Sequence, residues 1–219
     1  MLLIITREPP NRANKLRELY KSLDAREIPY IVSRKCDPAV IKRGDIRGLI
    51  IPGARFRVKP YEIQPALDLE LYYIHHFPHT PVLGICHGCQ FLMVYYGGTL
   101  QTYDNDTLWT GSHEVKLDLS RDSNIFKGQE EIEKLHFYFH ELPVAPLSSG
   151  VKTYVREIAW ITKFRDGRRR ACAFEFVKDR VYGVMFHPEL GHESRNIIYN
   201  FYDMVAASAS ASASASASL

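Results

Sequence analysis

The segment from Pro81 to Gln90 reads PVLGICHGCQ, and it decides which fold the rest of the chain is expected to form. Its apolar first half predicts a short buried strand, and the residues after it are compatible with a helix. Cys86 stands at the junction, framed by Gly84 and Gly88, as a nucleophile does on a sharp strand-to-helix turn where only glycine fits beside it. Such a turn exposes the thiol at the end of a sheet, and the free N–H groups of the helix N-terminus favour its thiolate form. Cys86 is therefore the predicted nucleophile.

A second motif, FHPE, supplies the groups that a cysteine nucleophile needs. It contains His187 and Glu189 and follows the apolar run Val181–Met185, about one hundred residues after Cys86. His187 can accept the thiol proton. Because Pro188 restricts the chain between them, the Glu189 carboxylate is close enough to hold the imidazole tautomer and to stabilise the imidazolium. The predicted triad is Cys86, His187 and Glu189.

Around these motifs, apolar runs alternate with segments of helical period. This βαβ rhythm predicts an α/β fold of the flavodoxin-like, doubly wound kind, with a mostly parallel mixed sheet and helices on both faces. The second half contains more alternating segments, which indicates extra antiparallel strands. Strands are expected at Leu2–Thr6, Tyr30–Ser33, Gly48–Ile51, Val82–Gly84, Glu114–Leu119, Leu135–Phe139, Val151–Arg156, Ile158–Phe164, Arg170–Val177 and Val181–Met185. Helices are expected at Asn14–Ser22, Pro38–Lys42, Ile63–His75 and Ser194–Ala206.

The last residues differ in composition from the rest of the chain. Residues 207–218 repeat Ala-Ser and contain nothing from which a core can form. We therefore expect one domain over residues 1–206 and a flexible low-complexity tail over residues 207–219.

Length and composition agree with a single enzyme domain. The chain has 219 residues, of which 46% are hydrophobic, and this is enough for a large core. No apolar run approaches the roughly 18 residues that span a bilayer, so no membrane association is expected. The N-terminal MLLIIT lacks the basic start of a signal peptide and predicts a first strand. Four cysteines without a disulfide pattern, one of them a working thiol, favour the reducing cytoplasm.

The charge distribution gives no reason to expect nucleic-acid binding. The net charge is only +3, and the one dense basic cluster, residues 165–170, reads RDGRRR. Because Asp166 and Gly167 favour a turn, this cluster is interpreted as a solvated hairpin tip. The alternative is a docking surface for an acidic partner.

Together the two motifs resemble those of the class I, or triad-type, glutamine amidotransferases. In that family the nucleophile lies in Gly-x-Cys-x-Gly-x-Gln, and the base and acid lie in His-Pro-Glu. The resemblance extends to about Val205, and the segment Gln90–Gln101 is most similar to the glutaminase subunits of GMP synthetases. It implies that the side-chain amide of glutamine is hydrolysed through a cysteine thioester without metal or organic cofactor. It also implies that an ATP-dependent synthetase subunit consumes the ammonia.

The resemblance further assigns roles beyond the triad. The backbone N–H groups of Gly53 and His87 are expected to form the oxyanion hole. Gln90, Phe139 and His140 are expected to bind the amino-acid end of the substrate.

Four positions depart from the family pattern. Phe139 stands where serine is common, which removes a hydroxyl and leaves the backbone contact possible. Cys89 stands where methionine or histidine is common, and a small apolar thiol can fill that space. Ala54 replaces a second glycine after the third strand, which the oxyanion hole tolerates unless the turn requires a positive φ. Leu142 stands where a substrate-binding carboxylate is common, and this change bears on substrate choice.

Alternatives remain open. With no phosphate-binding Gly-x-x-x-x-Gly-Lys motif in the sequence, either a separate synthetase accepts the ammonia or the protein is a stand-alone γ-glutamyl hydrolase or peptidase. A catalytically silent binding protein on the same fold is a third possibility. Cys86 and Cys89 have the spacing of a redox or zinc pair, but no second pair of ligands follows them.

Overall fold

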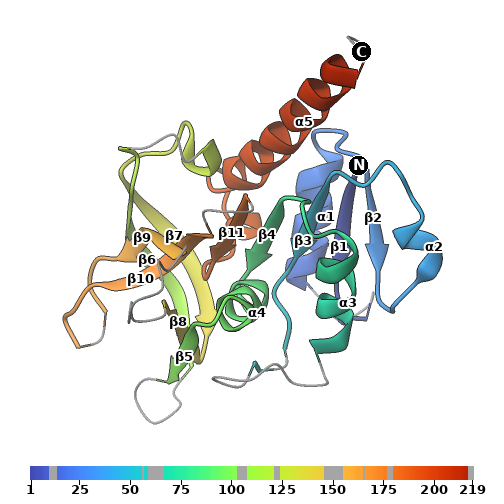
Figure 1. Ribbon diagram of the computed structural model, residues 1–219. Helices are drawn as coiled ribbons and strands as arrows, with labels where there is room; N and C mark the ends of the chain where they lie inside the picture. Colours follow the sequence, from blue (N-terminus) through green and yellow to red (C-terminus); the bar gives the residue numbers. More distant parts are fainter. Residues whose placement is uncertain are drawn as a thin grey trace, which may run out of the picture.

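The computed structural model describes residues 1–9, 14–55, 57–58, 67–102, 108–120, 124–145, 155–164, 166–176 and 180–216 (Figure 1). Over these residues the strands are β1 Leu2–Ile5, β2 Tyr30–Ser33, β3 Gly48–Ile51, β4 Val82–Ile85, β5 Thr99–Thr102, β6 Trp109–Leu117, β7 Ile132–Phe139, β8 Glu141–Val144, β9 Val155–Ile161, β10 Arg170–Phe176 and β11 Val181–Val184. The α-helices are α1 Asn14–Asp24, α2 Pro38–Ile41, α3 Asp68–His76, α4 His87–Tyr95 and α5 Asn196–Ser216, and the 3₁₀ helices are η3 Asn124–Phe126 and η4 Pro188–Leu190.

Within the described residues the main sheet has nine strands in the order β2-β1-β3-β4-β11-β10-β9-β6-β7. The strands from β2 to β11 pair in parallel, and those from β10 to β7 add antiparallel pairs. Strands β1, β3, β4 and β11 are buried along their whole length. Because parallel strands end at one edge of a sheet, the loops after β1, β3, β4 and β11 lie together there. The expected mixed, mostly parallel α/β fold is confirmed.

The helices cover both faces of the parallel strands. Figure 1 shows α3 and α4 over one face. On the other, Arg195, the residue before α5, forms an ion pair with Glu18 of α1. On the α5 side, Ile197, Ile198 and Phe201 are buried in the core. This layering agrees with the predicted doubly wound arrangement.

Several expected boundaries need correction. Val151–Arg156 and Ile158–Phe164 were expected to be separate strands, but one strand, β9, continues through Glu157, which pairs with Phe174 of β10. Residues 151–154 lie outside the described residues, as do 63–66, so the described part of the predicted helix Ile63–His75 is α3. Strands β5 and β8 form a separate two-stranded sheet that was not expected. They are short, β5 is half exposed and β8 contains a proline, so neither has the pattern of a strand.

The end of the last helix is a further correction. α5 continues through Ser216, beyond the predicted end at Ala206, and its end projects away from the body in Figure 1. Alanine has the highest helix propensity, so an Ala-Ser repeat can prolong a helix that the core has already nucleated. The division into a domain of 1–206 and a tail of 207–219 remains a prediction.

The basic cluster forms the expected turn where it is described. Gly167 has a φ of 75°, and its N–H donates to the Phe164 carbonyl at 2.8 Å. The Asp166 carboxylate accepts the Arg168 N–H at 3.0 Å, and the Arg169 guanidinium lies 3.7 Å from the centre of the Trp160 ring. Arg165 lies outside the described residues.

Among the helices that the structure describes, none combines the length and the apolar character needed to cross a membrane.

Candidate active site

The strand-to-helix turn at Cys86 has the strained geometry that its sequence predicts. Cys86 lies between β4 and α4 with a φ of 52° and a ψ of −101°, a backbone conformation that residues other than glycine rarely adopt. A Cβ at Gly84 would lie 2.6 Å from the Gly88 backbone, and one at Gly88 would lie 2.0 Å from the Ile51 carbonyl oxygen. Both glycines are therefore required by the close approach of α4 to β4 and β3.

The Cys86 thiol lies at the N-terminus of α4 and faces the antiparallel strands. Its side chain is 7% exposed, and Sγ donates to the carbonyl of Tyr138 in β7 at 3.2 Å. The thiol is thus largely buried in this structure rather than exposed as expected, and it lies beside the positive end of a helix dipole.

His187 and Glu189 follow β11 and meet the thiol. The His187 N–H donates to the His136 carbonyl at 2.7 Å, which fixes this segment against β7. Nδ1 of His187 lies 2.7 Å from Oε1 of Glu189, and the ring also hydrogen-bonds the Cys86 side chain. Because a carboxylate only accepts, Nδ1 carries the proton of the bond to Glu189 and Nε2 faces the sulfur.

The surroundings of His187 favour its charged form. Burial opposes the imidazolium, but the charges of Glu189 and Cys86 and their hydrogen bonds to the ring outweigh burial and raise the pKa of His187 to about 9. Both His187 and Glu189 are 2% exposed. The pair is therefore a buried acid–base unit with its second nitrogen directed at a thiol.

Gly53 lies directly against this unit, in the loop after β3. A Cβ at position 53 would lie 2.8 Å from Cε1 of His187 and 3.6 Å from Cβ of Cys86. Neither Gly53 nor Ala54 has a positive φ. Ala54 is therefore compatible with this loop, and glycine is needed at 53 for space.

The residues expected to bind substrate lie beside the elbow. Gln90, in the first turn of α4, donates from Nε2 to the Glu141 carbonyl at 2.9 Å. Phe139, at the end of β7, is 4% exposed and stacks on Trp109, so its ring belongs to the core. His140 lies between β7 and β8 and is partly exposed. The structure thus brings Gln90 and the 139–141 segment together.

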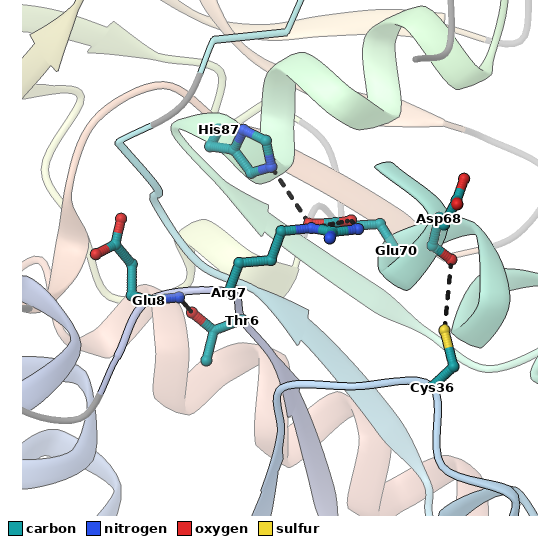
Figure 2. A network of polar contacts seen from close by, with 7 residues as sticks. All are labelled: Thr6, Arg7, Glu8, Cys36, Asp68, Glu70 and His87. Atoms are coloured by element: carbon teal, nitrogen blue, oxygen red, sulfur yellow. Dashed lines mark hydrogen bonds and ion pairs between the residues drawn. The ribbon is translucent and has the colours of Figure 1, made fainter. Parts of the chain in front are cut away.

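Two ionic contacts near the elbow were missed by sequence reasoning. Glu141 is buried and accepts from Nε of Arg57 at 2.6 Å. Glu70 of α3 is buried between Arg7 and His87 (Figure 2). A carboxylate inside an apolar helix was the only available signal for Glu70, because its partners are distant in sequence.

Cys89 is separate from this constellation. It is buried against β11, where a Cβ at Gly183 would lie 2.8 Å from its Sγ, and burial raises the pKa of its thiol well above the usual value. Cys86 and Cys89 are both free thiols. The described residues contain no group of three or more His, Cys, Asp or Glu that could hold a metal ion.

Comparison with known proteins agrees with this geometry. The family model described as glutamine amidotransferase class-I matches residues 12–205. The chain belongs to this family. The resemblance drawn from the two sequence motifs is thereby confirmed.

Similar proteins within the family include GMP synthases. The glutamine-hydrolyzing GMP synthase of Helicobacter pylori is 28% identical over 197 residues, which cover 86% of this chain and 32% of that protein. One subunit of the glutamine-hydrolyzing GMP synthase of Methanothermobacter thermautotrophicus is 25% identical over 225 residues, which cover 93% of this chain and 97% of that polypeptide. The chain thus spans about a third of the first protein and nearly all of the second.

A solved structure has the same fold. A protein from Thermoplasma acidophilum, described as a GMP synthase subunit, superposes with a TM-score of 0.72 at 17% identity, covering 96% of each chain.

Proposed function

We propose that this chain is a cysteine-dependent glutaminase that releases ammonia from the side-chain amide of glutamine. The observation that carries the proposal is the His187 ring, which hydrogen-bonds the Glu189 carboxylate on one side and the Cys86 thiol on the other. Membership of the class I family and the likeness to glutamine-hydrolyzing GMP synthases support glutamine as the substrate.

In the first half reaction the Cys86 thiolate attacks the amide carbon of glutamine. The C–S bond forms, and the carbonyl π electrons move to the oxygen, whose charge the N–H groups of Gly53 and His87 stabilise. As the intermediate collapses, the C–N bond breaks and His187 gives its proton to the departing nitrogen, which leaves as ammonia. The glutamyl group remains on Cys86 as a thioester.

The second half reaction needs His187 as a base, and the thioester provides the conditions for it. The charge on Cys86 is one of the causes that raise the pKa of His187 to about 9. A thioester carries no such charge, so the pKa of His187 falls once Cys86 is acylated. The neutral ring then takes a proton from water, the resulting hydroxide attacks the thioester, and glutamate leaves with Cys86 restored.

The neighbouring residues would fit the amino-acid end of glutamine. We assign this end to Gln90 and to the segment with Phe139 and His140. Phe139 acts there through its main chain, because its ring is packed in the core. The chemistry needs no metal or organic cofactor.

We further propose that the ammonia passes to an ATP-dependent synthetase of the GMP synthase type, in the cytoplasm. The match over 97% of a GMP synthase subunit supports this acceptor. Direct transfer is needed because ammonia released into neutral water becomes ammonium, which is no nucleophile.

Glutamate and ammonia formation from glutamine tests the proposal. The wild-type protein is expected to turn glutamine over, faster when the ATP-dependent subunit of a GMP synthase and ATP are added. Cys86→Ala should be inactive in both assays. Absence of turnover in the wild-type protein under both conditions would contradict the glutaminase function.

A stand-alone γ-glutamyl hydrolase or peptidase is the second candidate. It is favoured by one observation: Leu142 stands where the family often has a substrate-binding carboxylate, and it is buried, while the adjacent Glu141 carboxylate is occupied by Arg57. Turnover of γ-glutamyl peptides without turnover of free glutamine would favour this candidate. Turnover of neither would favour a silent binding protein.

A further inference from the structure

The loop after β1 contacts residues that adjoin the nucleophile elbow on both sides, namely Glu70 of α3 and the backbone of Arg55, and no step of the proposed reaction uses it. This loop contains Thr6, Arg7 and Glu8 (Figure 2). Arg7 pairs with Glu70 of α3, which in turn contacts His87 at the start of α4, whereas Glu8 contacts the loop that contains Gly53. These are the two places from which the oxyanion donors come in the proposed function, on which this inference rests.

The contact of Arg7 runs through a buried carboxylate. Its Nε and Nη2 both donate to Oε2 of Glu70, at 3.3 and 3.0 Å, and Oε1 of Glu70 lies 3.4 Å from Nε2 of His87. Burial opposes ionisation of Glu70, but the hydrogen bonds from His87 and Arg7 outweigh it and lower the pKa of this carboxyl. Because an ionised carboxylate only accepts, Nε2 of His87 carries a proton. The His87 ring is thus held between α3 and α4 by a charged anchor.

The contact of Glu8 is direct. Its Oε1 accepts the backbone N–H of Arg55, two residues after Gly53, at 2.8 Å. The loop itself is braced, since the Glu8 N–H donates to Oγ1 of Thr6 at 3.2 Å and the Glu8 carbonyl accepts from Nε of Arg34 at 3.1 Å. Glu8 therefore fixes the backbone that follows Gly53.

A role in stability alone does not account for this arrangement. Glu70 is 1% exposed, and a buried ion pair is often no more stabilising than apolar side chains of the same size. A buried pair does hold its neighbours in one geometry, which matters where donors must meet a developing charge within a fraction of an ångström. His87 and Gly53 occupy that situation, one on each side of Cys86.

We propose that Arg7, Glu8 and Glu70 are positioning residues that set the two backbone donors of the oxyanion hole, with Glu8 aligning the Gly53 loop and the Arg7–Glu70 pair aligning His87. The predicted effect falls on steps that create an oxyanion. Steps at Cys86 that create none are unaffected.

Two reagents separate these classes of step without requiring glutamine. Acylation of Cys86 by p-nitrophenyl acetate passes through a tetrahedral oxyanion, whereas alkylation by iodoacetamide displaces iodide at a saturated carbon. Both rates are measured on the full chain, with Cys86→Ala giving the background at other groups. The ratio of the two rates isolates the oxyanion hole and is defined even for a protein that does not hydrolyse glutamine.

The variants are Glu8→Ala, Glu8→Gln, Glu70→Gln and Arg7→Ala. Glu8→Gln keeps a carbonyl acceptor for the Arg55 N–H and should restore most of what Glu8→Ala loses. Asp37→Ala is the matched control for Glu8, because the Asp37 carboxylate also accepts a backbone N–H, that of Ala39 at 2.9 Å in the first turn of α2, away from the elbow. Glu175→Gln is the control for Glu70, because Glu175 pairs with Arg156 on the antiparallel strands.

The acylation-to-alkylation ratio is expected to fall about tenfold in Glu8→Ala, Glu70→Gln and Arg7→Ala, which is less than the 10²–10³ lost when a donor is removed outright. Glu8→Gln and both controls should stay within about twofold of the wild type. In glutamine hydrolysis the same three variants should lower kcat with little change in KM. An unchanged ratio, or a parallel loss of both rates, would overturn the proposal, and absence of glutamine turnover with the ratio altered would count against the glutaminase function alone.

Discussion

The parallel and antiparallel halves of the main sheet contribute to the site in different ways. Residues next to the parallel strands provide side chains and loops: Cys86 after β4, His187 after β11, and Gly53 after β3. The antiparallel half and β8 provide main-chain carbonyls. Tyr138 accepts from the Cys86 thiol, His136 from the His187 N–H, and Glu141 from the Gln90 amide.

The parallel half therefore provides the reacting groups, and the antiparallel half provides main-chain acceptors that hold them in place. Side chains that react must keep their identity, whereas a carbonyl is supplied by any residue in the same strand register. The side chains of the antiparallel strands that face solvent can therefore change without altering the wall that these strands form beside the elbow.

The largest effect is expected at the nucleophile of the parallel half. Cys86→Ser should lower glutamine hydrolysis by roughly 10⁴-fold or more, because the hydroxyl is a far weaker nucleophile at the same position. Glutamate formation measures the loss. Cys36→Ser, at the exposed cysteine before α2, is the control and should retain full activity. Comparable losses in both variants would mean that Cys86 is not the reacting thiol.

The next largest effect concerns the approach of α4 to the parallel strands. Gly88→Ala places a Cβ 2.0 Å from the Ile51 carbonyl oxygen, so the helix must move. We expect a loss of about 3 kcal/mol in the free energy of unfolding, measured by urea denaturation. Gly44→Ala meets no atom within 4 Å and should leave stability nearly unchanged. If Gly88→Ala were as stable as Gly44→Ala, the close approach of α4 to β3 at Gly88 would be contradicted.

A smaller effect is expected where the two halves meet, at His187. Glu189→Gln removes the leading cause that raises the pKa of His187 to about 9, so NMR titration should show a lower pKa for this ring. Glutamine hydrolysis should fall roughly 10²-fold, the lower end of what general acid–base catalysis contributes, because His187 itself is still present. Because the pKa of His187 is raised in the folded state, the charged ring contributes to the free energy of unfolding. This contribution is complete below the ordinary pKa near 6.5 and is lost as the pH rises through about 9.

The stability that Glu189→Gln loses should have the same pH dependence as this contribution of His187. Relative to the wild type, Glu189→Gln should lose more of its free energy of unfolding at pH 6 than at pH 10. The difference between the two losses should be about 1 kcal/mol or more. An equal loss at both pH values would show that Glu189 does not act through the charge of His187.

The smallest effect is expected in the antiparallel half. Tyr138 accepts from Cys86 through its main chain, and its side chain is 48% exposed. Tyr138→Ala should therefore keep kcat within about twofold of the wild type, as should Ile132→Ala, the control at the other end of β7. A tenfold loss in Tyr138→Ala alone would show that the antiparallel half contributes a side chain to the reaction.

The same division explains how much could be predicted from sequence. The elbow was predictable because its backbone needs glycine at 84 and 88. The limits of β2 and β3 coincide with those expected because both are short runs centred on apolar residues. The carbonyl contacts of β7 and β8 were not predictable, since a main-chain acceptor leaves no mark on residue type. The pair of Arg7 and Glu70 was also invisible, because 63 residues separate two ordinary charged side chains.

The unusual backbone of Cys86 also links reactivity to local order. A φ of 52° persists only while β4 and the first turn of α4 are both in place. If that turn frays, the residue relaxes to common dihedral angles and carries its sulfur away from the imidazole. The reactivity of the thiol therefore depends on the packing of α4 against β3 and β4, so a change that loosens this packing should also slow alkylation of Cys86.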